Sequence, residues 1–572
     1  MFKHKYSHLL AIFAFVVSLV IIFGWLGQLP LTQPDEARNA EVAREVHQSG
    51  TWLIPTYNGL AYLDKPIFYF KTVALSFSIF GELQGAARFS SAVFGFLLLV
   101  VLFTFCKREY DIRTATLAVL IVATTPLYFV FSRLVIFDMT LAFFVCTAIF
   151  ASYHAETREG RARSYWYLIA AAAAGAATLV KGPIGFIIPT LVIWVFNWLD
   201  GRKGAMKRFL AWPNLLLFSA VVLPWFVGVT LIHNDFPYYG IVKESLQRLT
   251  TDEFHRNKPF YFFGPVIALS FLAWSILLPE SVITAWKLRA KWSSADRLFI
   301  VWAIVVVLFF SISQSKVPSY VLSAVVALGI LTARTFIYAF DNRNGRAARI
   351  VLHGTLALAL VSTVISLVLA VYLFRPEMLQ QLLNIQNAKS ALFAPAIAPM
   401  AYLLAVVAFL AYIALVLRNA RFAFAAFLAF PLLLMTVGHS VFSVYADKRS
   451  ARALADQIPT LTQNTEIACL ECFPSGLDFY LHRYVTVLSK DGVELSSNYI
   501  LFRLKTAKVW PDTIVPLAEH RRWLATRNHP VYLMADDDEL PQLKAIAAAA
   551  NTDIQKLTRD YWGVLLPAAT QN

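Results

Sequence analysis

Charged side chains are scarce in this chain. They make up 15% of its 572 residues, whereas hydrophobic residues make up 58%. Because no soluble core of this size could hide so much apolar surface, the composition excludes an ordinary soluble globular protein. The class that remains is a protein that crosses a membrane several times.

Signals for nucleotide binding and for internal repeats are also absent. The sequence has neither a Walker phosphate loop nor a glycine-rich dinucleotide fingerprint, so a nucleotide-dependent enzyme is not indicated. It has no inverted repeat of the kind that builds many transporters, which leaves a lipid-linked sugar transporter as a remote alternative. The net charge of +15 does not indicate a nucleic-acid partner, because the basic residues gather between apolar segments, where they report membrane topology.

Cysteine is rare, with four residues in the chain. Cys469 and Cys472 form a CxxC pair, but Phe473 and Pro474 follow it in place of the helix that a redox pair needs. We therefore expect a structural disulfide or two free thiols there. No further Cys or spaced His pair accompanies them, so no metal site is predicted at this pair.

About 13 apolar segments of roughly 17–25 residues predict membrane-spanning helices. Their approximate bounds are 9–29, 84–105, 114–132, 138–155, 165–180, 184–199, 211–232, 262–279, 298–314, 317–339, 350–373, 395–417 and 422–443. Every second connection is rich in Lys or Arg, which is typical of cytoplasmic loops. These connections are Cys106–Arg113, Glu156–Arg163, Gly201–Arg208, Lys287–Arg297, Asn342–Arg349 and Arg418–Arg421. We therefore expect the amino terminus inside and the carboxyl terminus outside.

The composition changes at Tyr445, where the apolar runs become short. Segments 465–470, 484–488, 499–504 and 530–534 alternate as strands do, between amphipathic helical patterns. The predicted fold class is a polytopic α-helical membrane protein with a C-terminal soluble α/β domain. The predicted domains are a transmembrane domain, residues 1–444, and a domain outside the membrane, residues 445–572, which we call the terminal domain.

Charge is concentrated in the first outer loop, Thr32–Lys71. Pro34 followed by two acidic residues predicts a helix start, and Gly50 predicts its end. Asp35 and Arg38 are three residues apart, as are Glu41 and Arg44, so each pair shares a helix face. One interpretation is a solvated interfacial helix with ion pairs, and the other is one wall of an active site.

Four later outer connections also carry ionisable or tyrosine side chains. One such cation is typical of a membrane surface, but several at one surface run against the usual charge bias and suit an anionic headgroup. Without nucleotide motifs, an enzyme at this surface needs an activated substrate delivered in the lipid, such as a polyprenyl-phosphate sugar. Among these residues are Arg133, Asp138, Lys181, Lys243, Glu244, Arg248, His255, Lys316 and Tyr320.

Several motifs resemble the bacterial aminoarabinose transferase family, which has the GT-C fold and is related to the protein O-mannosyltransferases. They are PDEARNAEVAREV, NGLAYLDKP, SRLVIFDM, LVKGPIG and SKVPSY. The resemblance implies an inner-membrane enzyme of bacteria with its site and terminal domain in the periplasm. It implies an undecaprenyl-phosphate-linked sugar as donor, most often 4-amino-4-deoxy-L-arabinose, and lipid A or a similar phospho-glycolipid as acceptor. No cofactor is required, although a divalent metal between outer carboxylates stays open.

The resemblance also implies roles for particular residues. Asp35 is the expected catalytic carboxylate, and Lys65, Arg248 and Tyr320 are expected to bind the donor phosphate. The other residues expected to bind substrate are Arg38, Glu41, Tyr62, Asp64, Arg133, Asp138, Glu244, His255 and Lys316. Asn39 and Asp64 depart from the Tyr and Glu that are frequent in the family, so another lipid-linked sugar, or a protein or glycan hydroxyl acceptor, stays open.

Overall fold

The computed structural model describes residues 2–247, 257–287, 292–375, 387–507 and 509–569. The chain divides into two compact units. The first unit contains residues 1–24, 91–224 and 241–445, and the second contains residues 25–90, 225–240 and 446–572. The first outer loop is thus grouped with the terminal domain, and the predicted division at residues 444 and 445 stays a prediction. The predicted class, many apolar helices plus a C-terminal α/β domain, is confirmed.

Nine helices in the described ranges are long and apolar enough to cross a membrane. All of the predicted spans fall on helices, but some are interrupted. Segment 114–132 is broken between α5, Ile112–Ala123, and α6, Pro126–Phe131, because Pro126 has no N–H to continue the helical ladder. Segment 262–279 is likewise divided into shorter helices. The apolar helix α3, Phe68–Phe80, lies within the predicted first outer connection and was not predicted as a span.

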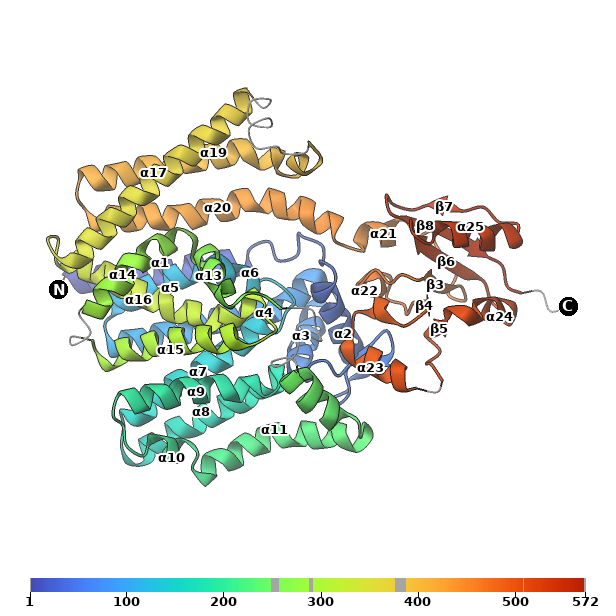
Figure 1. The fold of residues 1–572 in the computed structure, drawn as a ribbon, viewed down its shortest axis with the longest axis horizontal. Helices are drawn as coiled ribbons and strands as arrows, with labels where there is room; N and C mark the ends of the chain where they lie inside the picture. The colour runs from blue at the N-terminus through green and yellow to red at the C-terminus, as the bar shows by residue number, and fades with distance from the viewer. Residues whose placement is uncertain (1, 248–256, 288–291, 376–386, 508, 570–572) are drawn as a thin grey trace. The chain divides into compact units, whose positions relative to one another are not determined.

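The first unit is built from helices (Figure 1). Helices α7, α8 and α9 contact one another, and α16 contacts both α5 and α15. Helices α4, α11, α20 and η1 continue into the second unit. The elements are α1 (Phe2–Phe23), α4 (Gln84–Glu109), α5, α6, α7 (Asp138–Glu156), α8 (Gly160–Lys181), α9 (Ile184–Leu199), α10 (Ala205–Phe209), α11 (Trp212–Ile232), η1 (Tyr238–Gln247), η2 (Phe260–Phe262), α13 (Phe263–Phe271), η3 (Leu272–Leu277), α14 (Leu278–Lys287), α15 (Ser294–Ile312), η5 (Pro318–Val321), α16 (Leu322–Asp341), α17 (Arg346–Phe374), α19 (Asn387–Val416) and α20 (Ala420–Lys448).

Gly185 allows α8 and α9 to approach closely. A Cβ built on Gly185 would lie 2.3 Å from the carbonyl carbon of Ala177 and 2.4 Å from the nitrogen of Thr178. Because these neighbours are backbone atoms, they cannot rotate away as a side chain would. The close approach of these two helices therefore depends on glycine at this position.

The second unit contains a six-stranded sheet with strand order β5-β4-β3-β6-β8-β7. Strands β5, β4, β3 and β6 run parallel, whereas β8 is antiparallel to both of its neighbours. The elements of the unit are α2 (Asp35–Ser49), β1 (Thr56–Tyr57), β2 (Leu60–Ala61), α3, α21 (Arg452–Gln457), β3 (Glu466–Leu470), α22 (Leu477–Leu481), β4 (Thr486–Ser489), η6 (Val493–Leu495), α23 (Asn498–Thr506), β5 (Ile514–Pro516), η7 (Leu517–Glu519), α24 (His520–Ala525), β6 (Val531–Asp536), α25 (Leu540–Ala549), β7 (Gln555–Lys556) and β8 (Tyr561–Leu566).

Three of the four predicted strands are confirmed as β3, β4 and β6. The prediction of a strand at 499–504 is wrong, because these residues lie in α23. The Ser497 side chain accepts a hydrogen bond from Ile500 N–H at 3.3 Å and caps the start of this helix. The apolar run itself is ambiguous, because buried Tyr499, Ile500 and Leu504 fit one face of a helix as well as a strand. The Ser497 cap is the local signal that favours the helix.

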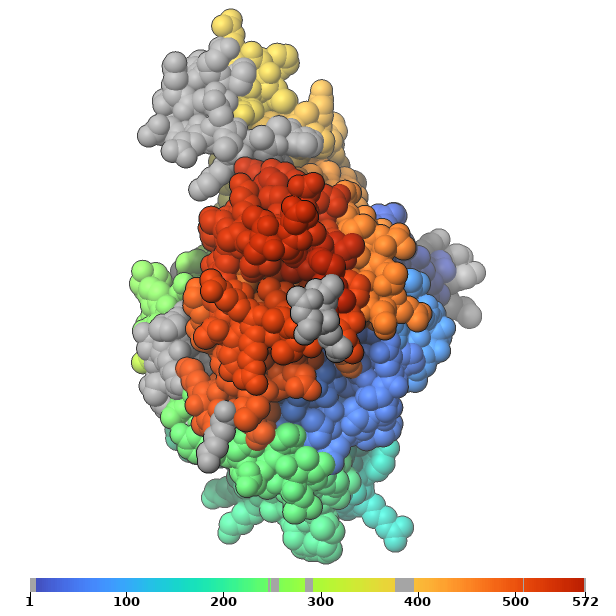
Figure 2. Space-filling view, turned by 90° about the vertical axis from the view of Figure 1, so that its right-hand side faces the viewer, coloured from blue at the N-terminus to red at the C-terminus, as the bar shows by residue number. Residues whose placement is uncertain are grey.

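The first outer loop packs against the terminal domain within the second unit. The Asn58 side chain donates to Val485 O at 2.8 Å and accepts from Val485 N–H at 3.0 Å. Directly before the loop, Leu31 N–H donates to the Tyr480 hydroxyl at 2.8 Å. Figure 2 shows blue residues of the loop directly against orange residues of the terminal domain. The loop is therefore an integral part of this unit.

Candidate functional site

Helix α2 begins and ends where its sequence predicts. Pro34 precedes it, Asp35 and Glu36 lie in its first turn, and Gly50 follows with φ of 65°. The interpretation of α2 as a solvated helix is wrong, because most of its residues are buried. The buried charged residues are Glu36, Glu41, Arg44 and Glu45.

Asp35 keeps an exposed carboxylate. Its side chain is 52% exposed and is paired with Arg38, three residues later, which confirms the predicted pair. Arg38 also donates to the Ser496 carbonyl oxygen at 2.7 Å, and its guanidinium lies 5.9 Å from the centre of the Tyr62 ring. The exposed carboxylate of Asp35 is thus oriented by an arginine whose side chain is only 12% exposed, and it is accessible to a substrate.

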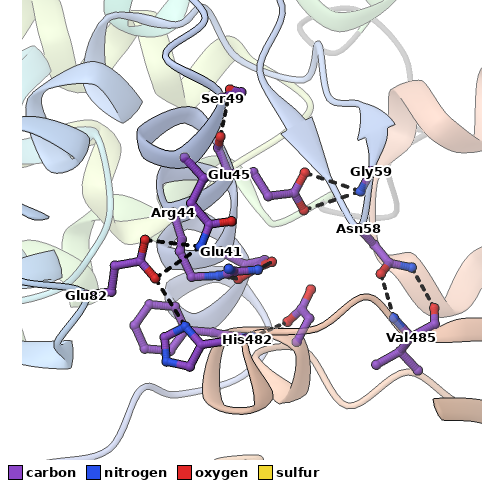
Figure 3. Close-up of polar contacts among 12 residues, drawn as sticks. Glu41, Arg44, Glu45, Ser49, Asn58, Gly59, Glu82, His482 and Val485 are labelled. Atoms are coloured by element: carbon purple, nitrogen blue, oxygen red, sulfur yellow. Dashed lines mark hydrogen bonds and ion pairs between the residues drawn. The ribbon is translucent and has the colours of Figure 1, made fainter. Parts of the chain in front are cut away.

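A second group of carboxyls on α2, whose polar contacts Figure 3 shows, is buried. Arg44 donates to both oxygens of Glu41, at 2.6 and 2.5 Å, which confirms the other predicted pair. Glu45 accepts from Gly59 N–H at 3.2 Å. Burial and the charge of Glu41 raise the pKa of Glu45 to about 7, and burial together with Glu41 raises the pKa of Asp478 well above its ordinary value. The cluster has three buried carboxyls around one guanidinium, so it retains a proton near neutral pH.

Asp64 and Lys65 occupy neighbouring positions with different exposure. Asp64 is 8% exposed, and its carboxylate accepts from the Tyr239 hydroxyl at 2.5 Å and from Tyr499 N–H at 2.7 Å. Lys65 is only partly buried, and its ammonium group donates to the carbonyl oxygen of Asp64 at 2.6 Å. The expected substrate role of Asp64 stays a prediction, but the structure gives its carboxylate donors from the protein itself.

The first unit brings together three residues that the sequence places in separate connections. Lys181, at the end of α8, donates to Asp138 at the start of α7, with a distance of 2.6 Å. Its ammonium group also lies 5.1 Å from the centre of the Tyr320 ring and 4.9 Å from that of Phe137. The sequence predicts Lys181 only as a cation at the outer surface, and its VKGPIG motif is the signal that could have indicated a role in the site.

The remaining predicted site residues of the first unit have varied surroundings. Arg133 donates to the carbonyl oxygens of Ile21 and Ile22, at 2.7 and 3.2 Å. It thus supplies hydrogen-bond donors for carbonyl groups of the last turn of α1, which have no partner within the helix. Lys316 is buried and donates to Ser313 O at 2.5 Å. Glu244 lies half-buried in η1. The predicted residues Arg248 and His255 lie outside the described residues.

No group of three or more His, Cys, Asp or Glu side chains in the described ranges could hold a metal ion. Whether a divalent ion takes part stays a prediction. Cys469 and Cys472 are both buried, free thiols. Of the two expectations for this pair, free thiols rather than a disulfide are therefore observed.

The chain is similar to known sugar transferases in sequence. Residues 64–227 match the family model described as dolichyl-phosphate-mannose-protein mannosyltransferase. The undecaprenyl phosphate-alpha-4-amino-4-deoxy-L-arabinose arabinosyl transferase of Edwardsiella ictaluri is 28% identical over 59% of this chain and 61% of its own length. The corresponding protein of Aeromonas hydrophila is 31% identical over 57% of this chain and 59% of its own length. The chain thus spans about three fifths of the length of these relatives.

Similarity of structure extends further than similarity of sequence. The crystal structure of ArnT from Cupriavidus metallidurans, bound to undecaprenyl phosphate, covers 97% of both chains with a TM-score of 0.80 and 24% identity. This chain has the ArnT fold. The resemblance to the aminoarabinose transferases is thereby confirmed, as is a multi-pass membrane architecture. In this ArnT fold the residue roles expected from the sequence stay predictions.

Proposed function

We propose that this chain transfers 4-amino-4-deoxy-L-arabinose from undecaprenyl phosphate to a lipid A phosphate, at the periplasmic face of a bacterial inner membrane. The observation that carries the proposal is the 28–31% identity with proteins named as transferases of this sugar. The ArnT fold supports it, as does an exposed carboxylate on a buried and therefore well-ordered helix.

The transfer reaction mainly requires that the protein place positive charge near the leaving phosphate. The leaving group is a phosphate monoester, which is stable as an anion and needs positive charge nearby as the glycosidic bond lengthens. We assign this work to Lys65, with Arg248 and Tyr320 as further phosphate ligands. An acceptor phosphate with a second pKa near 6 is mostly ionised at neutral pH, so it needs no strong base. Asp35 then orients the acceptor and stabilises positive charge on the sugar ring.

The direct test uses purified protein with undecaprenyl phosphate-linked aminoarabinose and lipid A. We expect release of undecaprenyl phosphate and a mass increase of lipid A equal to one amino sugar. The same protein with undecaprenyl phosphate-linked mannose is the control for donor choice. Turnover of the mannose donor, without turnover of the aminoarabinose donor, would contradict the proposal.

Replacement of Lys65 tests the phosphate assignment. Lys65→Ala should lower donor turnover by about 10²–10³-fold, because it removes one group that stabilises developing negative charge. Lys71→Ala is a matched control, since Lys71 lies in the same loop, donates to Gly50 O and covers the Trp52 ring. We expect Lys71→Ala to retain wild-type turnover. Equal turnover of Lys65→Ala and wild type would refute the assignment.

A second candidate is transfer to a protein or glycan hydroxyl, which the mannosyltransferase description of the family model favours. A hydroxyl must lose a proton, and a positioned base contributes roughly 10²–10⁴-fold. With a hydroxyl acceptor, Asp35→Asn should therefore lose at least about 100-fold in turnover. With a phosphate acceptor, the same variant should stay within about tenfold of wild type.

A further inference from the structure

One turn of the terminal domain, Ser496–Tyr499, contacts both halves of the first outer loop. On one side, Arg38 donates to the Ser496 carbonyl oxygen at 2.7 Å while it pairs with Asp35. On the other side, Asp64 accepts the N–H groups of Asn498 and Tyr499, at 3.1 and 2.7 Å. The turn thus connects the segment that carries Asp35 with the segment that carries Lys65.

The chemistry of these contacts suits a rigid junction. The first N–H groups of α23 have no partner within the helix, and the helix start favours negative charge. Ser497 accepts one of these N–H groups, from Ile500, and Asp64 accepts two more. Asp64 is 8% exposed, so these charge-assisted bonds are shielded from water.

A third segment joins at the same place. The Tyr239 hydroxyl, at the start of η1, donates to Asp64 at 2.5 Å, and its ring centre lies 5.0 Å from that of Tyr499. The Tyr499 hydroxyl donates to Asp235 at 3.2 Å, and Arg503 pairs with the same carboxylate at 3.2 Å. Residues 225–240, the first loop and α23 therefore meet around Asp64 within the second unit.

We propose that the turn Ser496–Tyr499 positions the two candidate reacting groups, with Arg38 and Asp64 as positioning residues that hold Asp35 and Lys65 at a fixed separation. This inference rests on the proposed function for the roles of Asp35 and Lys65. It gives the terminal domain a task in sugar transfer, and it assigns Asp64 to the protein's own backbone rather than to a sugar hydroxyl.

The first arm of the test measures the contact without activity. Hydrogen exchange on the full chain in detergent or nanodiscs should be faster by at least tenfold at Asn498 and Tyr499 in Asp64→Asn, because the amide has no negative charge and keeps only one of the two acceptor oxygens. Exchange within β6 should stay unchanged, which excludes general unfolding. Unchanged exchange at both amides would overturn the proposal.

The second arm measures turnover. A misplacement of about 1 Å can cost up to 10²-fold in rate, so we expect Asp64→Asn to lower kcat by 10–100-fold. Asp64→Glu retains a carboxylate and should recover most of that loss. Tyr239→Phe removes one hydroxyl from the junction and should lower kcat severalfold, and it serves where Asp64→Asn does not fold. Tyr238→Phe, whose ring is exposed, is the matched control and should match wild type.

The outcomes separate the possible roles of Asp64. Lower kcat with faster exchange at the two amides supports positioning. Lower kcat with wild-type exchange indicates direct contact with substrate and overturns the proposal, as does an equal effect of Tyr239→Phe and Tyr238→Phe. If the wild-type protein transfers no aminoarabinose, the proposed function fails, and the exchange arm still decides whether Asp64 holds the turn.

Discussion

Removal of Arg88 should destabilise the protein more than removal of any exposed cation. Arg88 is 5% exposed at its side chain and uses all of its N–H groups. It donates to both oxygens of Glu36, at 2.7 and 3.0 Å, and to the carbonyl oxygens of Leu26, Leu29 and Pro30. These contacts fix the segment that leads from α1 to α2.

The magnitude follows from what Arg88→Met leaves behind. The Glu36 side chain is 1% exposed, so the variant buries a carboxylate without its cation, which costs about 3–5 kcal/mol. In Glu36→Gln the arginine keeps one oxygen acceptor and its carbonyl partners, and we expect a cost of about 1–3 kcal/mol. The double variant should cost less than the sum of the single variants, because it leaves no unpaired carboxylate.

The assay is denaturant unfolding in detergent, followed by tryptophan fluorescence. Arg113→Met is the matched control, because Arg113 pairs with Asp341 with side chains 41% and 56% exposed, and such pairs contribute about 0–1 kcal/mol. Arg88→Met within about 1 kcal/mol of wild type would refute the reasoning. Strict additivity of the two single variants would also refute it.

Two further predictions concern stability. The pKa of Glu45 is raised to about 7 by burial and by Glu41, so the folded state binds more protons than the unfolded state between about pH 4.5 and 7. The free energy of unfolding should therefore fall as pH rises through that window, by up to about 3 kcal/mol, and urea titrations of Glu45→Gln should show a flatter pH dependence than wild type. In Gly185→Ala the new methyl group meets the backbone of Ala177, so thermal unfolding should show a loss of about 1–3 kcal/mol, whereas Gly264→Ala, with nothing within 4 Å, should lose at most about 1 kcal/mol. A wild-type midpoint for Gly185→Ala, or a Glu45→Gln profile parallel to wild type, would contradict these expectations.

The parts of the fold that local chemistry decides could be predicted from the sequence. Pro34 and Gly50 define the ends of α2, and residues three apart on it form the expected pairs. Apolar length identifies the membrane helices, because lipid requires long apolar helices. Strands β3, β4 and β6 follow from short apolar runs, whereas the predicted strand at 499–504 is wrong, because six residues fit the period of a helix as well as that of a strand.

The surroundings of the candidate site could be predicted only in part. The charge of the first loop was visible in the sequence, but the burial of Glu41 and Glu45 depends on the packing of α2 against α22, which lies more than 400 positions later in the chain. The N–H groups that donate to Asp64, those of Asn498 and Tyr499, are similarly remote. No short-range pattern reports such contacts, so the sequence predicts a substrate-binding role for Asp64 but not its contacts with the terminal domain.

The second unit consists of three separate stretches of the chain, and this affects how the unit folds during synthesis. Asp64 leaves the ribosome 434 residues before Asn498, whose N–H it accepts. At roughly 5–20 residues per second, that delay lasts roughly 20–90 seconds. During this time the first loop has already been synthesised, but the terminal domain against which its acidic side chains pack has not. Ribosome-bound chains that end before residue 496 should therefore carry a first loop that proteases cleave, and the completed chain should protect it.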